Sequence, residues 1–210
     1  MSYDPHQHQR RSIRLRGYDY AQPGEYFVTI CVQQHECLLG KVVADEMAPN
    51  DAGEVVASWW TELPRKFPSC GVDGFVVMPN HVHGIVVIRE AAVGADASEG
   101  GDDRGAHPSL RSRAGSGAPL QVSGIEGPPD RVTLGSIVQW FKTMTTNAYV
   151  RGVTERGWTP FIERLWQRNY YEHIVRDEDD LGRVRDYITN NPRSWKDDPD
   201  NPSVATSTTS

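Results

Sequence analysis

The stretch "VVMPNHVHGIVVI", residues 76–88, decides the fold, because it places two apolar β-branched runs on either side of a turn. Residues 72–79 and 82–89 predict two adjacent strands, with Pro79 and Asn80 in the turn between them. His81 and His83 stand two residues apart at the start of the second strand. Successive residues of a strand point to opposite faces, so we expect both imidazoles on one face, with roughly 6 to 7 Å between their Cα atoms.

The segments around this pair of strands complete an α+β pattern. Residues 25–33 ("EYFVTICVQ") and 37–43 ("CLLGKVV") predict two further strands, which we expect to pair as a hairpin. Helical spacing of apolar residues predicts helices over 50–68, 133–150 and 177–191, the last ending before Pro192. The alternation of strands and helices predicts an antiparallel or mixed sheet with helices packed on one face.

Three segments lack the composition of a packed core. Residues 90–130 are rich in Gly, Ala, Ser, Asp and Pro without an apolar period, and predict a flexible insertion. Residues 196–210 predict a disordered tail, and residues 1–24 a basic N-terminal arm. We therefore expect a single catalytic or binding domain over 25–195 that tolerates the insertion.

The formal charge of −6 argues, taken alone, against a partner such as nucleic acid. The charge is unevenly distributed, however, because residues 1–18 carry +3 and residues 131–176 carry +4. These two basic segments are either ordinary solvated faces or a local positive surface.

The sequence also bears on cellular location. No apolar run approaches the roughly 20 residues that a membrane span needs, and the N-terminal residues lack the apolar core of a signal peptide. We expect a cytoplasmic protein without a membrane partner. Cys31, Cys37 and Cys70 have no metal-ligand spacing and are interpreted as reduced thiols.

Two histidines on one strand face could hold a metal ion, although such residues also cap loops or pack at a helix–sheet seam. Two imidazoles alone do not define a site, so a further ligand must come from elsewhere. Tyr187 and Asn191 lie four residues apart on one face of the last predicted helix, where an amide oxygen and a phenol could converge on the metal. Core packing of Tyr187 and a helix-terminal role for Asn191 are the alternatives.

Four segments, in this order along the chain, resemble a known family: "GEYFVTICVQQHECLLGKVV", "MPNHVHGIVVI", "SIVQWFKTMTTNAYV" and "LWQRNYYEHIVRDEDDLGRVRDYITNNPRSW". Together they resemble the tyrosine transposases associated with repetitive extragenic palindromes, which are single-strand transposases with a His-hydrophobe-His motif. The resemblance covers most of residues 10–197 apart from the insertion. The insertion and the acidic total charge extend or depart from the family pattern.

This resemblance implies a ferredoxin-like antiparallel sheet, with the nucleophile helix near the C-terminus laid across it. It implies that His81, His83 and Asn191 bind a single divalent metal, Mg²⁺ or Mn²⁺, and that Tyr187 is the nucleophile. The implied enzyme nicks single-stranded or hairpin DNA, keeps the 5′ end on tyrosine as a phosphotyrosine, and transfers the strand. It works as a monomer or a homodimer, with the Tyr187 helix serving its own subunit or its partner's.

Basic residues interleaved with aromatic residues suit phosphates and unstacked bases. We expect DNA contacts from Arg14, Arg16, Lys142, Arg164, Arg168, Arg176, Trp140 and Trp166. His173 could orient a phosphate or the nucleophile, or make a structural hydrogen bond. Tyr170 and Tyr171 are rival nucleophiles without an amide four residues further on.

Two other functions stay open at this point. A protein derived from such a transposase could bind hairpin DNA without cutting it. A small metalloprotein or hydrolase unrelated to DNA could use the histidines for metal and bury Tyr187 in its core.

Overall fold

The four-stranded antiparallel sheet at the centre of the protein has the strand order β4-β5-β1-β6. A computed structural model describes residues 17–90 and 131–205. The strands are β1 (Gly24–Cys31), β4 (Cys70–Val77), β5 (His81–Ile88) and β6 (Tyr171–Ile174). Most of the predicted N-terminal arm and insertion, with Arg14 and Arg16, lies outside the described residues.

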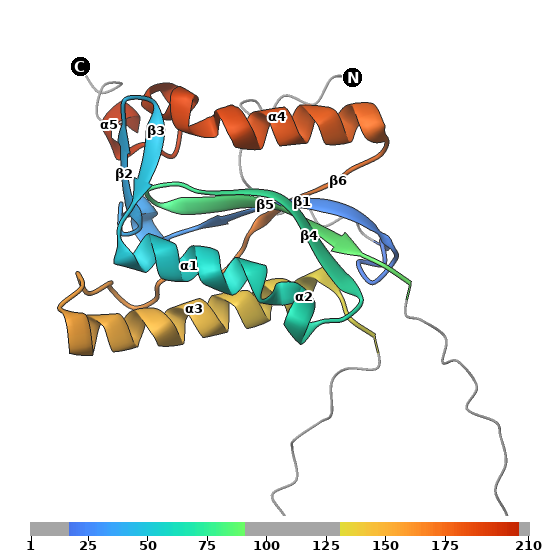
Figure 1. The fold of residues 1–210 in the computed structure, drawn as a ribbon, viewed down its shortest axis with the longest axis horizontal. Coiled ribbons are helices and arrows are strands. Elements are labelled where there is room, and N and C mark those ends of the chain that lie inside the picture. Colours follow the sequence, from blue (N-terminus) through green and yellow to red (C-terminus); the bar gives the residue numbers. More distant parts are fainter. Residues whose placement is uncertain (1–16, 91–130, 206–210) are drawn as a thin grey trace, which may run out of the picture. The chain divides into compact units, whose positions relative to one another are not determined.

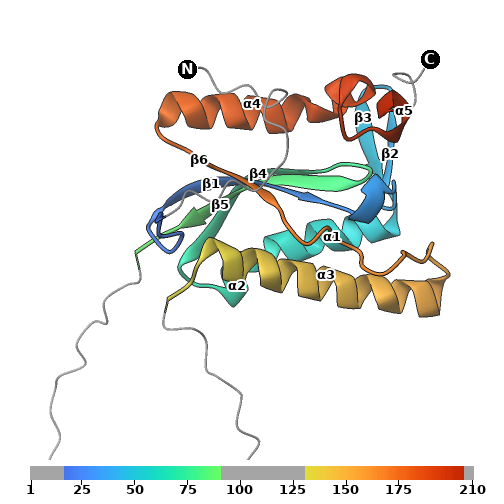
Figure 2. The same cartoon turned by 180° about the vertical axis from the view of Figure 1, so that it is seen from behind.

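Helices cover both faces of this sheet. One face carries α1 (Asp51–Thr61), the short α2 (Leu63–Lys66) and α3 (Leu134–Arg156), whereas α4 (Glu178–Ser194) lies on the opposite face (Figures 1 and 2). The order β1-α1-β4-β5-α3-β6 around one antiparallel sheet is the ferredoxin-like arrangement. The predicted fold is confirmed: two main helices share one face, and a C-terminal helix is laid across the sheet.

Local side chains fix where the helices begin. Asn50 accepts a hydrogen bond from the backbone of Gly53 at the start of α1, and Thr133 forms a capping box with Ser136 at the start of α3. Asp177 caps α4 in the same way. The predicted stop of α4 before proline is wrong, because Pro192 lies in the last turn, where its missing N–H removes only one bond of the helix.

The predicted hairpin between 25–33 and 37–43 is also wrong. Strand β1 is central in the sheet and pairs with β5 and β6. The second run supplies β2 (Gly40–Val43), which pairs with β3 (Glu46–Pro49) in a separate two-stranded ribbon. Ala44 and Asp45 join them with φ of 51° and 63°, the conformation that a tight two-residue hairpin turn requires.

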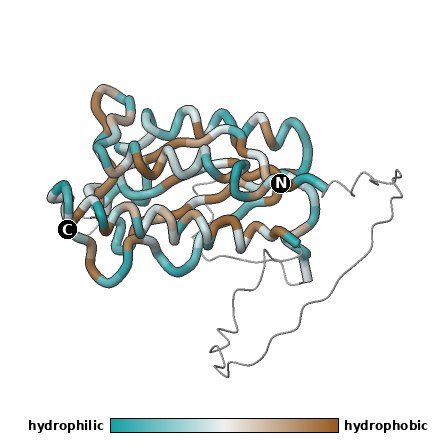
Figure 3. The backbone as a smooth tube through the Cα atoms, turned by 60° about the horizontal axis from the view of Figure 1, so that its bottom comes forward, coloured by the Kyte–Doolittle hydropathy of each residue, from teal (hydrophilic) through white to brown (hydrophobic). Residues whose placement is uncertain are grey.

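The sheet face under α1 and α3 is apolar throughout. Val28, Ile30, Val82 and Val86 are fully buried there among large side chains such as Trp60. In Figure 3 the apolar segments gather in the strands between the helices. Gly84 interrupts this face because a Cβ at this position would collide with the indole of Trp60.

The chain from Trp195 to Ala205 is ordered, so the predicted disorder of 196–210 is wrong as far as residue 205. It contains the 3₁₀ helix η2 (Trp195–Asp197) and the short α5 (Pro202–Ala205). Asp198 accepts a hydrogen bond from the backbone of Asp200 at 2.7 Å, and Asn201 donates one to the carbonyl of Trp195 at 2.9 Å. Polar side chains therefore hold a segment that has little apolar content; residues 206–210 lie outside the described part.

Within the described ranges, no helix combines the length and apolar character needed to cross a membrane. All three cysteines belong to these ranges, and none forms a disulfide.

Candidate metal and nucleophile site

His81 and His83 lie on the same face of β5, under α4. Strand register places His83 opposite Thr29 and His81 opposite Cys31 of β1. The two imidazoles are 0% and 2% exposed, and their ring centroids are 4.4 Å apart. The two buried imidazoles form a polar cluster on the α4 face of the sheet, whereas the opposite face is apolar.

The Nδ1 atoms of both histidines are held by neighbouring side chains. His83 Nδ1 lies 2.8 Å from the hydroxyl of Thr29, and His81 Nδ1 lies 2.9 Å from Oδ1 of Asn80. The amide group of Asn80 donates to the carbonyls of His35 and Asp200, which fixes its oxygen as the atom facing His81. His81 therefore carries its proton on Nδ1 and keeps the Nε2 lone pair for a ligand, as in metal sites with outer-shell hydrogen bonds.

Helix α4 passes over the two imidazoles. The hydroxyl of Tyr187 lies 3.4 Å from Nε2 of His83, and their ring centroids are 5.1 Å apart. The ring of Trp195, two turns further along, lies 6.0 Å from the ring of His81. Asn191 is midway between them on the same helix face, because residues four apart overlie one another.

Asn191 is 2% exposed, and its Oδ1 atom has no hydrogen-bond partner among the residues that the structure describes. A buried amide oxygen without a partner reduces the stability of the fold by about 1 to 3 kcal/mol, and coordination to a metal ion would offset this cost. The structure thus brings His81, His83 and Tyr187 together, and it buries Asn191 one turn from Tyr187 on the same helix.

Asp198 is a site residue that the sequence did not predict. It is 3% exposed, and one ligand atom from each of His81, His83 and Asp198 lies within 4.8 Å of the others. It belongs to residues 196–210, for which composition predicts a disordered tail. The turn-forming pattern "DDPDNP" at 197–202 was the signal for an ordered segment, since Asp and Asn fold back onto the backbone in such turns.

The donor set fits a divalent cation. Two imidazole nitrogens and one carboxylate oxygen lie within 4.8 Å of one another, and the helix above them carries the buried amide oxygen of Asn191. Imidazole with oxygen donors suits Mn²⁺ or Mg²⁺, the former with higher intrinsic affinity. Phe27 packs beside this group, with its ring stacked 5.4 Å from that of His83, and limits the solvent around it.

Two residues that we expected to contact DNA have structural roles instead. Lys142 donates to the carbonyls of residues 167, 168 and 169 at 2.9, 3.3 and 3.1 Å, so all three ammonium donors are used. Burial lowers the pKa of Lys142 to about 8. Trp166 is 4% exposed and donates to Thr145 at 2.8 Å, which leaves no face on which a base could stack.

The remaining expected DNA contacts differ in exposure. Trp140 packs edge-on against Trp59 and Phe67 and lines the core. Arg168 and Arg176 are exposed, and Arg164 is half-buried. Among the expected arginines that the structure describes, Arg168 and Arg176 are therefore the ones accessible to a phosphate.

His173 makes a structural contact, with Nε2 2.8 Å from Oδ2 of Asp180. Although burial opposes the effect, hydrogen bonds from His173 and from the backbone of Arg176 hold the pKa of Asp180 below its usual value. This network ties β6 to the start of α4, far along the helix from Tyr187.

The rival tyrosines are less well placed than Tyr187. Tyr170 lies under the ammonium of Lys142, with 5.5 Å from Nζ to the ring centroid. Tyr171 pairs with Thr29 across the sheet and contacts Phe27 edge-on at 6.3 Å. The hydroxyl of Tyr187, by comparison, lies 3.4 Å from Nε2 of His83 in the site.

No family model matches the sequence. An uncharacterised protein of Haemophilus influenzae is 39% identical over 193 residues, which span 91% of this chain and 92% of that protein. The structure of a tyrosine transposase associated with repetitive extragenic palindromes, bound to such a hairpin, covers 92% of this chain and 74% of its own at 18% identity, with a TM-score of 0.47. A candidate transposase from Deinococcus radiodurans covers 83% of this chain and 94% of its own at 16% identity, with a TM-score of 0.36.

Proposed function

We propose that this chain, which belongs to the same family as the Haemophilus influenzae protein, is a metal-dependent transposase that nicks and transfers single strands of DNA. Its substrate is palindromic hairpin DNA, and its intermediate is a 5′-phosphotyrosine on Tyr187. A cytoplasmic location, where chromosomal DNA is accessible, agrees with this proposal.

The observation that carries the proposal is the position of the Tyr187 hydroxyl, 3.4 Å from Nε2 of His83. A phenol beside a buried imidazole pair, on a helix that also brings a buried amide oxygen, is costly for a protein core. The apolar first half of the same helix shows what ordinary packing on this face requires, namely Leu181 and Val184 in one cluster with Phe27 and Ile85. The polar half has the residue types that phosphodiester cleavage needs.

His81, His83, Asp198 and the amide of Asn191 would hold the cation, which neutralises the non-bridging phosphate oxygens when bound. The hydroxyl of Tyr187 loses its proton and attacks phosphorus. The bond from phosphorus to the 3′ oxygen breaks, and that oxygen takes up a proton to become a free 3′-hydroxyl. The phosphotyrosine ester conserves the bond, so a 3′-hydroxyl can attack it and reseal a strand without ATP.

The side chains around Tyr187 orient it for this step. Phe27 contacts its ring edge-on at a centroid distance of 5.8 Å, while the ring of His83 lies on another side of it. The phenol therefore has little rotational freedom, which lowers the entropic cost of reaching an in-line attack. The exposed Arg168 and Arg176 would meet the phosphates of the bound strand.

The test is a labelled-DNA cleavage assay. Single-stranded hairpins labelled at the 5′ or the 3′ end are incubated with the protein and Mn²⁺, and products are separated on denaturing gels. We expect a denaturant-resistant adduct that carries only the 3′-side label and a released fragment with a 3′-hydroxyl. Tyr187→Phe and His81→Ala should abolish both, whereas Tyr171→Phe should leave them unchanged.

The pattern of losses distinguishes the competing functions. Hairpin binding without an adduct under any divalent metal would replace the proposal with a non-cutting DNA-binding protein. Metal binding at His81 and His83 without salt-dependent DNA binding would indicate a metalloprotein unrelated to DNA. An adduct that survives Tyr187→Phe and is lost in Tyr171→Phe would move the nucleophile to β6.

A further inference from the structure

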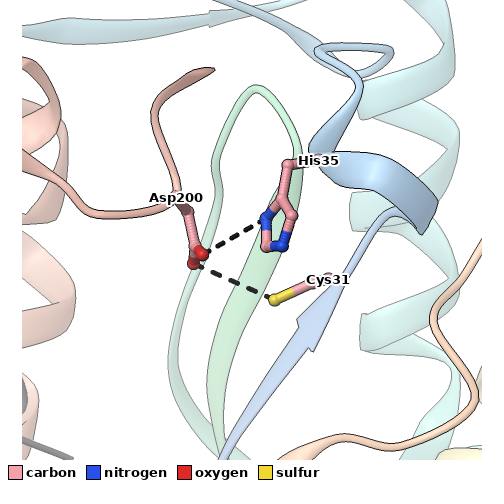
Figure 4. A group of neighbouring side chains, drawn as sticks. All are labelled: Cys31, His35 and Asp200. Atoms are coloured by element: carbon pink, nitrogen blue, oxygen red, sulfur yellow. Dashed lines mark hydrogen bonds and ion pairs between the residues drawn. The ribbon is translucent and has the colours of Figure 1, made fainter. Parts of the chain in front are cut away.

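A second group of potential metal ligands lies next to the His81–His83 site. Cys31 ends β1, His35 ends the 3₁₀ helix η1 (Gln33–His35), and Asp200 follows η2. One ligand atom from each of the three residues lies within 4.8 Å of the others. Figure 4 shows the imidazole and the thiol pointing at the two oxygens of the same carboxylate.

The distances in this group match those of a tetrahedral site. His35 Nδ1 lies 3.2 Å from Oδ1 of Asp200, and Cys31 Sγ lies 3.9 Å from Oδ2. With bonds of about 2.3 Å to sulfur and about 2.0 Å to nitrogen and oxygen, tetrahedral ligands are separated by about 3.3 Å (N to O) and about 3.5 Å (S to O). Small side-chain movements would therefore bring the three atoms onto one cation.

The surrounding structure holds the three ligands in place. Asn80 donates to the carbonyls of both His35 and Asp200, at 2.8 and 2.7 Å, and so fastens the two segments together. The side-chain nitrogen of Gln167 lies 2.9 Å from Nε2 of His35, the ring atom turned away from the carboxylate. Gln34 and His35 adopt φ of 57° and 55°, an uncommon conformation that turns the imidazole back toward β1.

We propose that Cys31 Sγ, His35 Nδ1 and the carboxylate of Asp200 form a second metal site, selective for a thiophilic divalent cation such as Zn²⁺. A thiolate with an imidazole and a carboxylate selects Zn²⁺ over Mg²⁺. Binding breaks the S–H bond of Cys31 and releases its proton to solvent. It also requires the His35 tautomer with the proton on Nε2, so the amide of Gln167 turns its oxygen toward this atom. The side chain of His35 is 36% exposed although its Nδ1 atom is buried, so a cation would enter beside this ring and carry a water molecule as the fourth ligand.

A cation in this second site would stabilise the neighbouring His81–His83 site. Oδ2 of Asp200 also lies 3.7 Å from Nδ1 of His81, and Asp198 is two residues away. A cation at Cys31 would fasten the C-terminal turn to the end of β1 and hold Asp198 beside the imidazole pair. The inference concerns metal binding and structure, and it does not rest on the proposed DNA chemistry.

Cobalt substitution tests the proposal directly, because only a sulfur ligand produces a thiolate-to-Co²⁺ charge-transfer band in the near ultraviolet. The reduced full-length chain is titrated with Co²⁺ in a Cys37→Ser background, which removes the exposed thiol. We expect the band in this background, its displacement by Zn²⁺, and its loss in Cys31→Ser. The matched control is Cys70→Ser, a second buried cysteine whose removal should leave the band unchanged.

Two more variants separate the sites and guard against misfolding. His83→Ala should keep the thiolate band, since His83 belongs to the neighbouring site. His35→Gln, a change at a partly exposed position, should weaken Co²⁺ binding at the thiolate more than roughly 10-fold, the loss that even an outer-shell change causes. Absence of the band at saturating Co²⁺ in folded protein, or its persistence in Cys31→Ser, would overturn the proposal.

Discussion

The two faces of the central sheet use the same strands for opposite purposes. Under α1 and α3, Val82 and Val86 of β5 pack against Trp60, and the contacts are apolar. Under α4, the alternate residues His81 and His83 of the same strand contact each other, and His83 contacts Tyr187. A one-residue step along β5 therefore separates a face that stabilises the fold from a face that holds chemistry.

Helix α4 repeats this division along its own length. Its first half packs Leu181 and Val184 on the sheet, and its second half places Tyr187 against the ring of His83 and carries Asn191 one turn further on. The apolar half fixes the height and angle of the helix, so the polar half can carry groups that stabilise nothing by themselves. Mutations on the two faces should accordingly separate stability from activity.

The largest expected effect is on the chemical face. Tyr187→Phe removes the attacking oxygen and should lower adduct formation by at least about 10⁴-fold, or about 5 kcal/mol in the barrier. The free energy of unfolding should change by less than about 1 kcal/mol, because only one half-exposed hydroxyl is lost. Single-turnover cleavage and urea denaturation measure the two effects. A large loss of stability would show that Tyr187 serves the core.

Trp60→Ala, on the apolar face under α1 and α3, should lower stability and leave the site on the other face intact. Trp60 is 1% exposed, stacks on Phe75 at 5.8 Å and contacts Phe141 edge-on at 5.4 Å. Its truncation should reduce the free energy of unfolding by about 3 to 4 kcal/mol while the folded fraction keeps its metal affinity. Trp59→Ala, at the neighbouring half-buried indole, is the control and should cost clearly less. Equal losses from both variants would contradict this account of the core.

Much of this division could be predicted from the sequence. The spacing of His81 and His83 predicts that both imidazoles lie on one strand face, and the spacing of Tyr187 and Asn191 predicts a shared helix face. Strand pairing was harder, because the run at 37–43 has the composition of a sheet strand and pairs elsewhere. Its partner, Glu46–Pro49, contains Glu, Ala and Pro, which are poor strand formers.

The order of the C-terminal turn could not be predicted from its composition, for a different physical reason. Asp198 and Asp200 are ordered by hydrogen bonds to backbone groups and to Asn80, which is more than a hundred residues away in the chain. Composition reports how much apolar surface a segment can bury, and this segment has little to bury. The same limit applied to Lys142 and Trp166, whose types suit nucleic acid but whose surroundings engage them within the protein.

A smaller effect, on Mn²⁺ affinity, is expected from a substitution at Asn191 in the second half of α4. Asn191→Leu replaces a buried amide whose oxygen has no partner in the described part of the chain. Affinity for Mn²⁺ should fall by about 10 to 100-fold, while the metal-free protein should unfold with an unchanged or slightly higher free energy, by up to about 1 kcal/mol. Isothermal titration and urea denaturation without metal give both values. The adjacent exposed Asn190→Leu is the matched control, and an equal loss of Mn²⁺ affinity in it would contradict the assignment.

The smallest effect concerns the start of α4, where Asp180 joins His173 to the helix. The pKa of this carboxyl is lower in the folded protein than its usual value of 3.8, so the folded state binds its proton less readily than the unfolded state does. The stability that the carboxylate contributes, about 1 to 2 kcal/mol, is therefore fully present above the usual aspartate pKa and is lost as the pH falls through the lower folded pKa. Asp180→Asn should be less stable than the wild type at pH 6, and the difference should shrink below pH 3.8. Because Asp180 belongs to the end of α4 that lacks the site, adduct formation at pH 7 by the folded variant should equal that of the wild type. A specific loss of cleavage in this variant would mean that His173 takes part in the chemistry. The division of α4 into a packing half and a chemical half would then be too simple.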